Sequence, residues 1–389
     1  MAPRASDPSA ERPPRSLRLD ALRVGLLVAA VCGHGLWIAS LAANWGQPEL
    51  LRRDFIVLHH AAQTAPEALY TAPLHDGPGA FPFLHPPPVA ALARLLTEVS
   101  PLGIYLGVIG LNALALGLLL WLLLRLRQDP ETRDVLVLAA LASAPWLIQL
   151  TLGQPAAVWP MLWVSGLSLS RRRPLLAGLI WSLTGLKPVF LVGALALAAL
   201  SGRRCLVGVA LGIAGLVIVS LTLGGEVWLD WLAAIGGASA AASHGAVLFK
   251  QHTVRASLVW LSVPYASVAA WALSAGLGGW TLAVAWRRRG EPFFLLSILA
   301  LATVVLSPYL YFYDAFLLIV PAAYRWRTGH TSAAAWVAVA LFLLHPAVYF
   351  GLQSGAPFGL IAAAWLVLEL LSPVTEGHEV GSSVPVRAQ

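Results

Sequence analysis

An aspartate follows the first long apolar run of the chain, where a membrane protein would meet the aqueous phase. The run covers about residues 21–43, and Asp54 lies about ten residues beyond it, after Arg52 and Arg53 and before Phe55. A carboxylate flanked by apolar surface can act as a general base that takes the proton of a substrate hydroxyl. It can equally be an interfacial acid that pairs with Arg52 or Arg53. The residues alone leave both interpretations open.

A lysine interrupts a long apolar stretch. Lys187 lies between the apolar runs 175–187 and 189–200 and is followed by Pro188. A cation at membrane depth costs about 2.5–3.5 kcal/mol on insertion scales. Snorkelling of the long side chain can lower this cost. Binding of an anion such as phosphate would offset it, and this is the function that we expect for Lys187.

Further polar residues stand at other expected turns between apolar runs. Gln154 follows Gly153 at one such turn, where it can cap the turn or hydrogen-bond a polar ligand. Tyr313 and Asp314 lie where another apolar run begins, among several aromatic residues. An acid at the membrane edge typically serves a ligand or a partner.

Two longer polar segments contain the remaining candidates. His85 precedes three prolines, which prevent helix formation and predict a rigid turn into the membrane. Lys250, His252 and Arg255 lie together in the second segment. Basic side chains of this kind suit phosphate groups and sugar hydroxyls, although a solvated loop would explain them equally well.

The candidate metal ligands have unsuitable spacing. On a helix, His59 and His60 would lie roughly 140° and 240° around from Asp54, so that neither shares its face. The two cysteines, Cys32 and Cys205, are far apart in sequence and lie in apolar runs. Neither a metal site nor a disulfide framework is indicated, and we expect no metal ion and no cofactor.

The composition shows what kind of protein must position these residues. Of 389 residues, 58% are hydrophobic and only 11% are charged, whereas soluble domains carry about 25% charged residues. The mean hydropathy of +0.76 agrees with this. The chain is therefore an integral membrane protein rather than a soluble enzyme or a disordered protein. Its net charge of +7 is interpreted as basic residues in cytoplasmic loops, not as a nucleic-acid-binding surface.

The apolar runs predict an all-α polytopic protein with about 12 transmembrane or re-entrant helices. Threading the chain so that every basic cluster is cytoplasmic places both termini in the cytoplasm and Lys187 at an outer apex. The runs 175–187 and 189–200 are too short to span alone, so we expect a re-entrant pair lining a cavity near Lys187. After the first helix, the apolar runs are 101–124, 134–150, 154–170, 175–187, 189–200, 205–223, 265–286, 291–306, 310–324, 331–350 and 357–372.

One membrane domain is expected, over residues 21–372, between a disordered cytoplasmic tail at 1–20 and a second tail at 373–389. The segments 44–100 and 224–264 are long enough to form structured outer loops, whereas the inner loops are short. This asymmetry predicts that the chemistry takes place on the periplasmic or extracytoplasmic face of the cell (inner) membrane.

Five ordered pieces of sequence resemble glycosyltransferase family 87, within the GT-C superfamily, over about residues 25–325. Family members often have Tyr where His85 stands, and mannosyltransferase relatives often have His where Tyr313 and Asp314 stand. The pieces are Asp54-Phe55 with Ala61-Ala62, Phe81 to Pro87, Leu152-Gly153-Gln154, Gly185-Leu186-Lys187-Pro188, and Ser307-Pro308-Tyr309 with Tyr313-Asp314.

The resemblance implies a GT-C-like helix bundle and an inverting sugar transfer outside the membrane. A hexose (mannose-like) or a pentose would pass from a polyprenyl-phosphate donor to a lipid or glycan acceptor, in contact with membrane lipids and without nucleic acid. It also implies that Asp54 is the general base. Lys187, with help from Gln154 or the basic residues of 244–255, would neutralise the departing phosphate.

Two other classes of protein would also carry buried charges. A polytopic transporter or lipid flippase is the main alternative, but its loops are usually compact on both sides. A non-catalytic membrane scaffold does not readily explain Lys187 or Asp314. The long outer segments and the interfacial Asp54 favour the enzyme.

Overall fold

The computed structural model describes residues 15–44, 54–71, 83–125, 130–242, 253–307, 310–327 and 356–372, and its regular elements are all helices. The first eight α-helices are α1 (Arg15–Ala43), α2 (Ile56–Gln63), α3 (Pro87–Ala93), α4 (Pro101–Arg125), α5 (Pro130–Ala142), α6 (Ala144–Leu152), α7 (Val158–Ser170) and α8 (Pro174–Ser182). The others are α9 (Pro188–Ser201), α10 (Arg203–Ser220), α11 (Val227–Ala242), α12 (Val254–Trp260), α13 (Ala266–Arg287), α14 (Pro292–Leu306), α15 (Ile319–Arg327) and α17 (Ala356–Leu371). Short 3₁₀ helices are η2 (Pro66–Ala68), η3 (Arg94–Leu96), η4 (Leu183–Leu186), η5 (Leu221–Leu223) and η7 (Phe312–Leu318).

The expected all-α polytopic fold is confirmed, but fewer helices are long enough to cross a membrane than the expected 12. In the described part of the chain four are long and apolar enough: Asp20–Ala43, Pro101–Arg125, Arg203–Leu223 and Ala266–Arg287. A fifth span is possible if the pair α5 and α6, bent by 44°, counts as one. Several other expected spans are apolar helices of 10–17 residues, because glycines, prolines and polar residues interrupt the runs. The expected span 331–350 lies outside the described residues.

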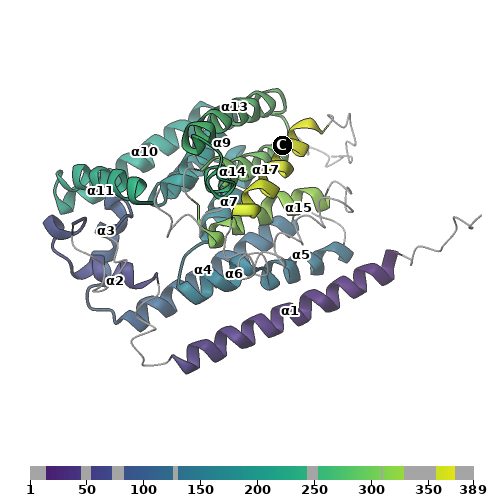
Figure 1. Cartoon of the computed structure of the whole chain (residues 1–389), viewed down its shortest axis with the longest axis horizontal. Coiled ribbons are helices and arrows are strands. Elements are labelled where there is room, and N and C mark those ends of the chain that lie inside the picture. Colours follow the sequence, from purple (N-terminus) through teal and green to yellow (C-terminus); the bar gives the residue numbers. More distant parts are fainter. Residues whose placement is uncertain are drawn as a thin grey trace, which may run out of the picture.

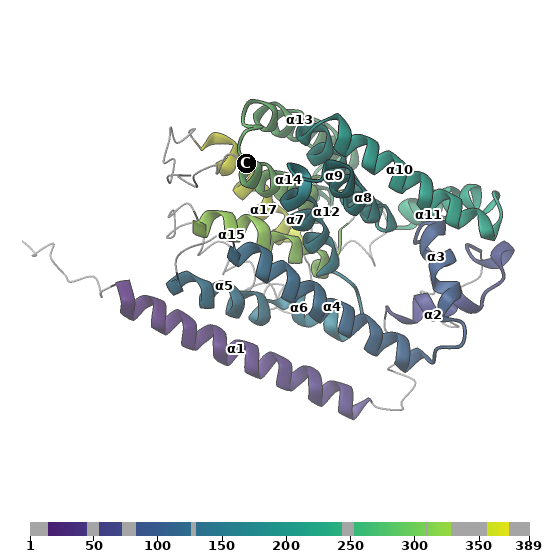
Figure 2. The ribbon, with the colours of Figure 1, turned by 180° about the vertical axis from the view of Figure 1, so that it is seen from behind.

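Two long helices border the bundle. α1 runs along one side and α13 along the opposite side, and the 25-residue α4 lies between them (Figures 1 and 2). α1 begins at Arg15, inside the segment expected to be a disordered tail, since the residues that follow are good helix formers. The tail 373–389 lies outside the described residues.

Small residues allow a close contact between α8 and α10. Gly178 of α8 faces Gly208 of α10, and a Cβ added to Gly178 would lie 2.1 Å from the carbonyl oxygen of Cys205. One turn further, Ser182 of α8 meets Gly212 of α10 in the same way. Small residues four apart on both helices are the usual device for close packing in membranes. This packing fixes η4, which continues α8 toward Lys187.

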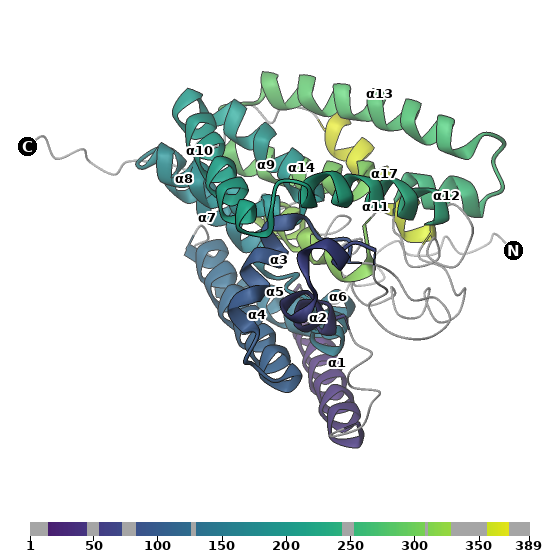
Figure 3. The ribbon, with the colours of Figure 1, turned by 90° about the vertical axis from the view of Figure 1, so that its left-hand side faces the viewer.

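α2, α3 and α11 gather at one end of the molecule (Figure 1), and the end-on view shows them in front of the bundle (Figure 3). They come from the two segments expected to form outer loops. A separate apolar cluster joins them, formed by Ala61 and Ala62 of α2, Ala90, Ala91 and Ala93 around α3, and Val227 of α11. This end of the molecule therefore has a structure of its own, as the length of the two segments predicts.

Candidate functional site

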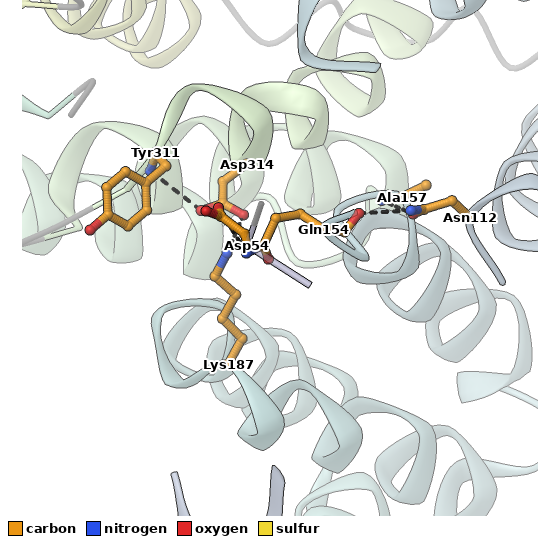
Figure 4. A network of polar contacts seen from close by, with 7 residues as sticks. All are labelled: Asp54, Asn112, Gln154, Ala157, Lys187, Tyr311 and Asp314. Atoms are coloured by element: carbon orange, nitrogen blue, oxygen red, sulfur yellow. Dashed lines mark hydrogen bonds and ion pairs between the residues drawn. The ribbon is translucent and has the colours of Figure 1, made fainter. Parts of the chain in front are cut away.

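Four polar side chains from four separate segments converge in one place. Gln154, after α6, donates a hydrogen bond from Nε2 to Oδ2 of Asp54, just before α2, at 3.0 Å. Lys187, between η4 and α9, lies with Nζ 2.5 Å from Oδ1 of Asp314 in η7. The two pairs belong to one site, because the Asp54 carboxylate acts electrostatically on that of Asp314, and Figure 4 shows all four polar ends turned toward one another.

The backbone beside Asp54 is fixed to the end of α6. The backbone N–H of Phe55 donates to the carbonyl of Leu152 at 3.1 Å. The Phe55 ring is buried and its centroid lies 5.0 Å from that of Tyr105 in α4. The hydroxyl of Tyr105 in turn donates to the carbonyl of Leu150. Asp54 is therefore anchored to the bundle by its neighbour, although it belongs to a connecting segment.

Gln154 sits in a tight turn between α6 and α7. The turn requires Gly153, which has φ +70° and lies so close to Phe55 and Tyr105 that a Cβ would approach them to 2.8 and 3.0 Å. The backbone N–H groups of Gly153 and Gln154 both donate to the carbonyl of Gln149, which satisfies the C-terminal end of α6. The turn places the Gln154 side chain within hydrogen-bond distance of Asp54.

A buried amide on α4 holds the same turn from the other side. Asn112 donates from Nδ2 to the carbonyl oxygen of Gln154 at 2.7 Å and accepts at Oδ1 from the backbone N–H of Ala157 at 3.3 Å. Asn112 was not among the residues expected from the sequence. A signal for it exists, since it is a polar residue in the middle of a 25-residue apolar helix, and polar residues inside membrane helices are usually functional.

The ion pair between Lys187 and Asp314 is buried. Lys187 is 8% exposed and Asp314 is 1% exposed. Oδ2 of Asp314 accepts from the backbone N–H of Tyr311 at 3.3 Å, and the ring of Tyr313 lies 4.8 Å from Lys187 Nζ. Lys187 stands at the break between η4 and α9, where Pro188 begins the new helix. The two short helices expected around Lys187 therefore meet there as predicted.

His85 lies close enough to Lys187 to be affected by its charge. Burial, with a further contribution from Lys187, lowers the pKa of His85 to about 4. The carbonyl of His85 accepts from the hydroxyl of Tyr70, and the imidazole lies 5.4 Å from the ring of Phe83. His85 is thus a neutral, positioned imidazole at pH 7, able to hydrogen-bond a hydroxyl but not to pair as a cation with an anion.

The basic residues of the second long segment are only partly described. Lys250 and His252 lie outside the described residues. Arg255 lies in the first turn of α12 and is half-buried, and its Nε is buried without a hydrogen-bond partner. No described contact joins Arg255 to the four converging side chains. The structure therefore brings together Asp54, Gln154, Lys187, His85, Tyr313 and Asp314.

An apolar groove is lined in part by Gly185 and Pro188, which lie on either side of Lys187 in the chain, while Lys187 itself is not among its lining residues. Its volume is about 280 Å³. Trp231 is held in its wall by a hydrogen bond from Nε1 to the carbonyl of Leu84. The groove is lined by Pro86 and Pro88, by Gly185, Pro188 and Leu191, by Ile213, Leu216 and Val217 of α10, and by Trp228 and Trp231 of α11.

The site thus combines a positioned carboxylate, a buried cation and an adjoining apolar groove. Among the residues that the structure describes, no three His, Cys, Asp or Glu side chains are grouped to hold a metal ion. A carboxylate of this kind can accept a proton, and a buried ammonium can stabilise a developing negative charge.

Comparison with known proteins identifies the family. Residues 83–308, more than half of the 389 residues, match the model of glycosyltransferase family 87. The matched range includes His85, Asn112, Gln154 and Lys187, whereas Asp54 precedes it. No curated protein and no solved structure matches the chain at a significant level. The chain belongs to glycosyltransferase family 87 and is a glycosyltransferase.

Proposed function

We propose that this glycosyltransferase moves a hexose (mannose-like) or a pentose from a polyprenyl-phosphate donor to a hydroxyl of a lipid or glycan acceptor. The observation that carries the proposal is the position of Asp54 beside a buried cation, Lys187. An apolar groove lined by Gly185 and Pro188, which lie on either side of Lys187 in the chain, supports it. Family membership favours this enzyme over the alternative of a transporter or lipid flippase.

Asp54 acts as the general base of a single displacement. Its carboxylate takes the proton of the acceptor hydroxyl while the hydroxyl oxygen attacks the anomeric carbon and the bond from that carbon to the phosphate oxygen breaks. One displacement inverts the anomeric configuration. The hydrogen bond from Gln154 Nε2 orients the Asp54 carboxylate and favours its ionised form.

Charge balance explains the value of Lys187 in this step. The donor phosphate changes from one negative charge to two as polyprenyl phosphate leaves, while Asp54 becomes neutral on protonation. Lys187 stabilises the charge that develops on the phosphate. Asp54, Lys187 and Asp314 together carry one net negative charge before the donor binds, so further cations are needed, and Lys250, His252 and Arg255 are the candidates.

The uncharged polar groups suit the sugar. The neutral imidazole of His85 can donate or accept a hydrogen bond with a sugar hydroxyl. Tyr313, whose ring stacks on that of Tyr311 with centroids 5.7 Å apart, offers an aromatic surface for the sugar ring. The groove that begins between Pro86 and Pro188 suits the first isoprene units of the donor, because an isoprenoid tail has no polar group to satisfy.

The position of the enzyme in the cell follows from its charges. With every basic cluster in the cytoplasm, both termini are cytoplasmic and the site opens on the extracytoplasmic face of the cell (inner) membrane. A lipid-linked donor fits this location, since nucleotide sugars are made in the cytoplasm and a polyprenyl carrier can cross with the bilayer.

The test is transfer by the purified protein in lipid nanodiscs. The donors are radiolabelled polyprenyl-phosphate mannose and a polyprenyl-phosphate pentose, and the acceptors are a panel of membrane lipids and glycans. We expect transfer with inversion, its loss in Asp54→Asn, and its survival in His59→Ala. Full transfer by Asp54→Asn would refute the role of Asp54 as base. Transport of the intact donor without transfer would support the flippase instead.

A further inference from the structure

Asn112 lies deep in the bundle and both ends of its amide are used. It is fully buried, and it is the eleventh residue after Pro101, about 16 Å along α4 from the N-terminal end of that helix. Its two hydrogen bonds go to backbone groups of the α6–α7 turn, at Gln154 and Ala157. Neither bond goes to a side chain of another helix, so both hydrogen bonds of Asn112 stabilise the turn.

The turn needs such a partner because it is buried. Ala157 caps the N-terminal end of α7, where backbone N–H groups have no partner within the helix. The carbonyl of Gln154 likewise follows the end of α6. At the protein surface water would satisfy both groups, whereas in a dry interior each unsatisfied group would cost about 1–3 kcal/mol. Asn112 supplies one donor and one acceptor in the required places.

Two hydrogen bonds connect this amide to the base, and a third fixes the residue beside the base. Asn112 bonds the main chain of Gln154, the side chain of Gln154 bonds Oδ2 of Asp54, and the main chain of Phe55 bonds Leu152 at the other end of the same turn. Figure 4 shows Asn112, Gln154 and Asp54 in this order. The only polar residue of α4 before Arg125, apart from Tyr105, thus reaches Asp54 through one intervening residue.

We propose that Asn112 is a positioning residue for sugar transfer. It fixes the α6–α7 turn so that Gln154 holds the Asp54 carboxylate in the direction of the acceptor hydroxyl. This inference rests on the proposed role of Asp54 as general base. Because Asn112 acts through Gln154, its loss changes proton transfer and leaves donor binding nearly unchanged.

A double-mutant cycle tests the connection. Asn112→Leu keeps the size of the side chain and removes both hydrogen bonds, and Gln154→Met removes the bond to Asp54. We expect Asn112→Leu to lower kcat about tenfold or more, since small misplacements of reacting groups cost up to about 100-fold, with KM for polyprenyl-phosphate mannose changed less than about threefold. In the Gln154→Met background, the further loss should be below about threefold. Equal losses in both backgrounds would overturn the inference.

The pH profile separates positioning from a loss of folding. Without the Gln154 hydrogen bond the ionised base is less favoured, so the acidic limb of the transfer rate moves to higher pH in Asn112→Leu. Leu119→Val, two turns along α4 and also fully buried, is the matched control. It should lower Tm without moving the limb or kcat per folded molecule. If the acidic limb of the pH profile stayed in place in Asn112→Leu, Asn112 would have a structural role only.

A conservative variant and an activity-independent measurement complete the test. Asn112→Asp keeps the acceptor for Ala157 but loses the donor to the Gln154 carbonyl, so it should not rescue kcat. The rate of amide hydrogen exchange in residues 153–157 should rise in Asn112→Leu and stay unchanged in Leu119→Val. An unchanged rate in Asn112→Leu would contradict the proposal that Asn112 fixes the α6–α7 turn. If Asp54→Asn is fully active, the proposed function fails. If Asp54→Asn is inactive but Asn112→Leu lowers kcat equally in the wild type and in Gln154→Met, only the proposed role of Asn112 fails.

Discussion

Nζ of Lys187 lies 2.5 Å from Oδ1 of Asp314, and both side chains are buried where α9 begins. The cation that we propose to hold the donor phosphate is therefore already paired, with a carboxylate that also accepts from the main chain of Tyr311. A buried pair of this kind costs desolvation on both sides and is held only by good geometry and further hydrogen bonds. A buried pair is weak evidence for added stability, whereas the contact with Asp314 fixes the orientation of Lys187.

Lys187→Met separates these two contributions. The single variant leaves Asp314 buried without its cation, and removing one partner of a buried pair costs about 3–5 kcal/mol. We therefore expect a lower Tm. In Lys187→Met with Asp314→Asn no buried charge is left alone, and most of the loss in Tm should be recovered.

Donor binding should not be recovered by that double variant. The phosphate would still lack its cation, so affinity for polyprenyl-phosphate mannose, measured by equilibrium binding in nanodiscs, stays at least about tenfold weaker than in the wild type. Donor affinity equal to the wild type, in the double variant with its fold preserved, would refute the phosphate role of Lys187.

Gly153 is a second place where a small change should affect the site. Its φ of +70° and its contacts with Phe55 and Tyr105 leave no room for a Cβ. Gly153→Ala should cost about 1–3 kcal/mol of stability and lower kcat, because the turn carries Gln154. Gly110→Ala is the matched control, since nothing lies within 4 Å of the added Cβ in the middle of α4. Tm from thermal unfolding and kcat for transfer are measured for both variants. Equal values in Gly153→Ala and Gly110→Ala would show that the turn tolerates a side chain at position 153.

Four of the candidate residues chosen from the sequence converge in the structure, whereas the described chain has fewer long spans than the expected 12. Asp54, Gln154, Lys187 and Asp314 could be chosen because each is a polar residue where apolar sequence surrounds it, and the cost of burying it calls for a function. Their pairing could not be predicted, because it depends on how η7 packs against α6 and α9. Asp314 was expected to serve a ligand or a partner, and in the structure it pairs with Lys187.

The lengths of the helices could not be predicted from the sequence. Hydropathy predicts where the chain is apolar, but Ser143 caps α6 and divides the run 134–150 into two helices bent by 44°. The role of Asn112 depends on contacts with a turn more than 40 residues away in sequence. Long-range contacts of this kind leave no periodic signal in a single sequence.

His85 makes stability depend on pH. Its pKa is lowered from the ordinary 6.5 to about 4 in the folded protein, so between these values the unfolded chain binds more protons than the folded one. Stability is then full above about pH 6.5 and falls as the pH drops toward 4. Between pH 7 and pH 5 we expect Tm to fall more in the wild type than in His85→Gln, by roughly 2–4 °C. Equal decreases would show that His85 is not held neutral by its surroundings.

The apolar groove predicts a dependence on the length of the donor tail. Leu216 of α10 lines the groove, whereas Leu211 on the same helix does not line it and is 58% exposed. Leu216→Trp fills the groove, so KM for a long-chain polyprenyl-phosphate sugar should rise about tenfold, and KM for a water-soluble donor with a very short prenyl chain should change little. Leu211→Trp, the matched control, should change neither. If Leu216→Trp raised both values of KM equally, the groove would not hold the tail, and the effect would have to come from the phosphate or sugar end of the site near Pro188.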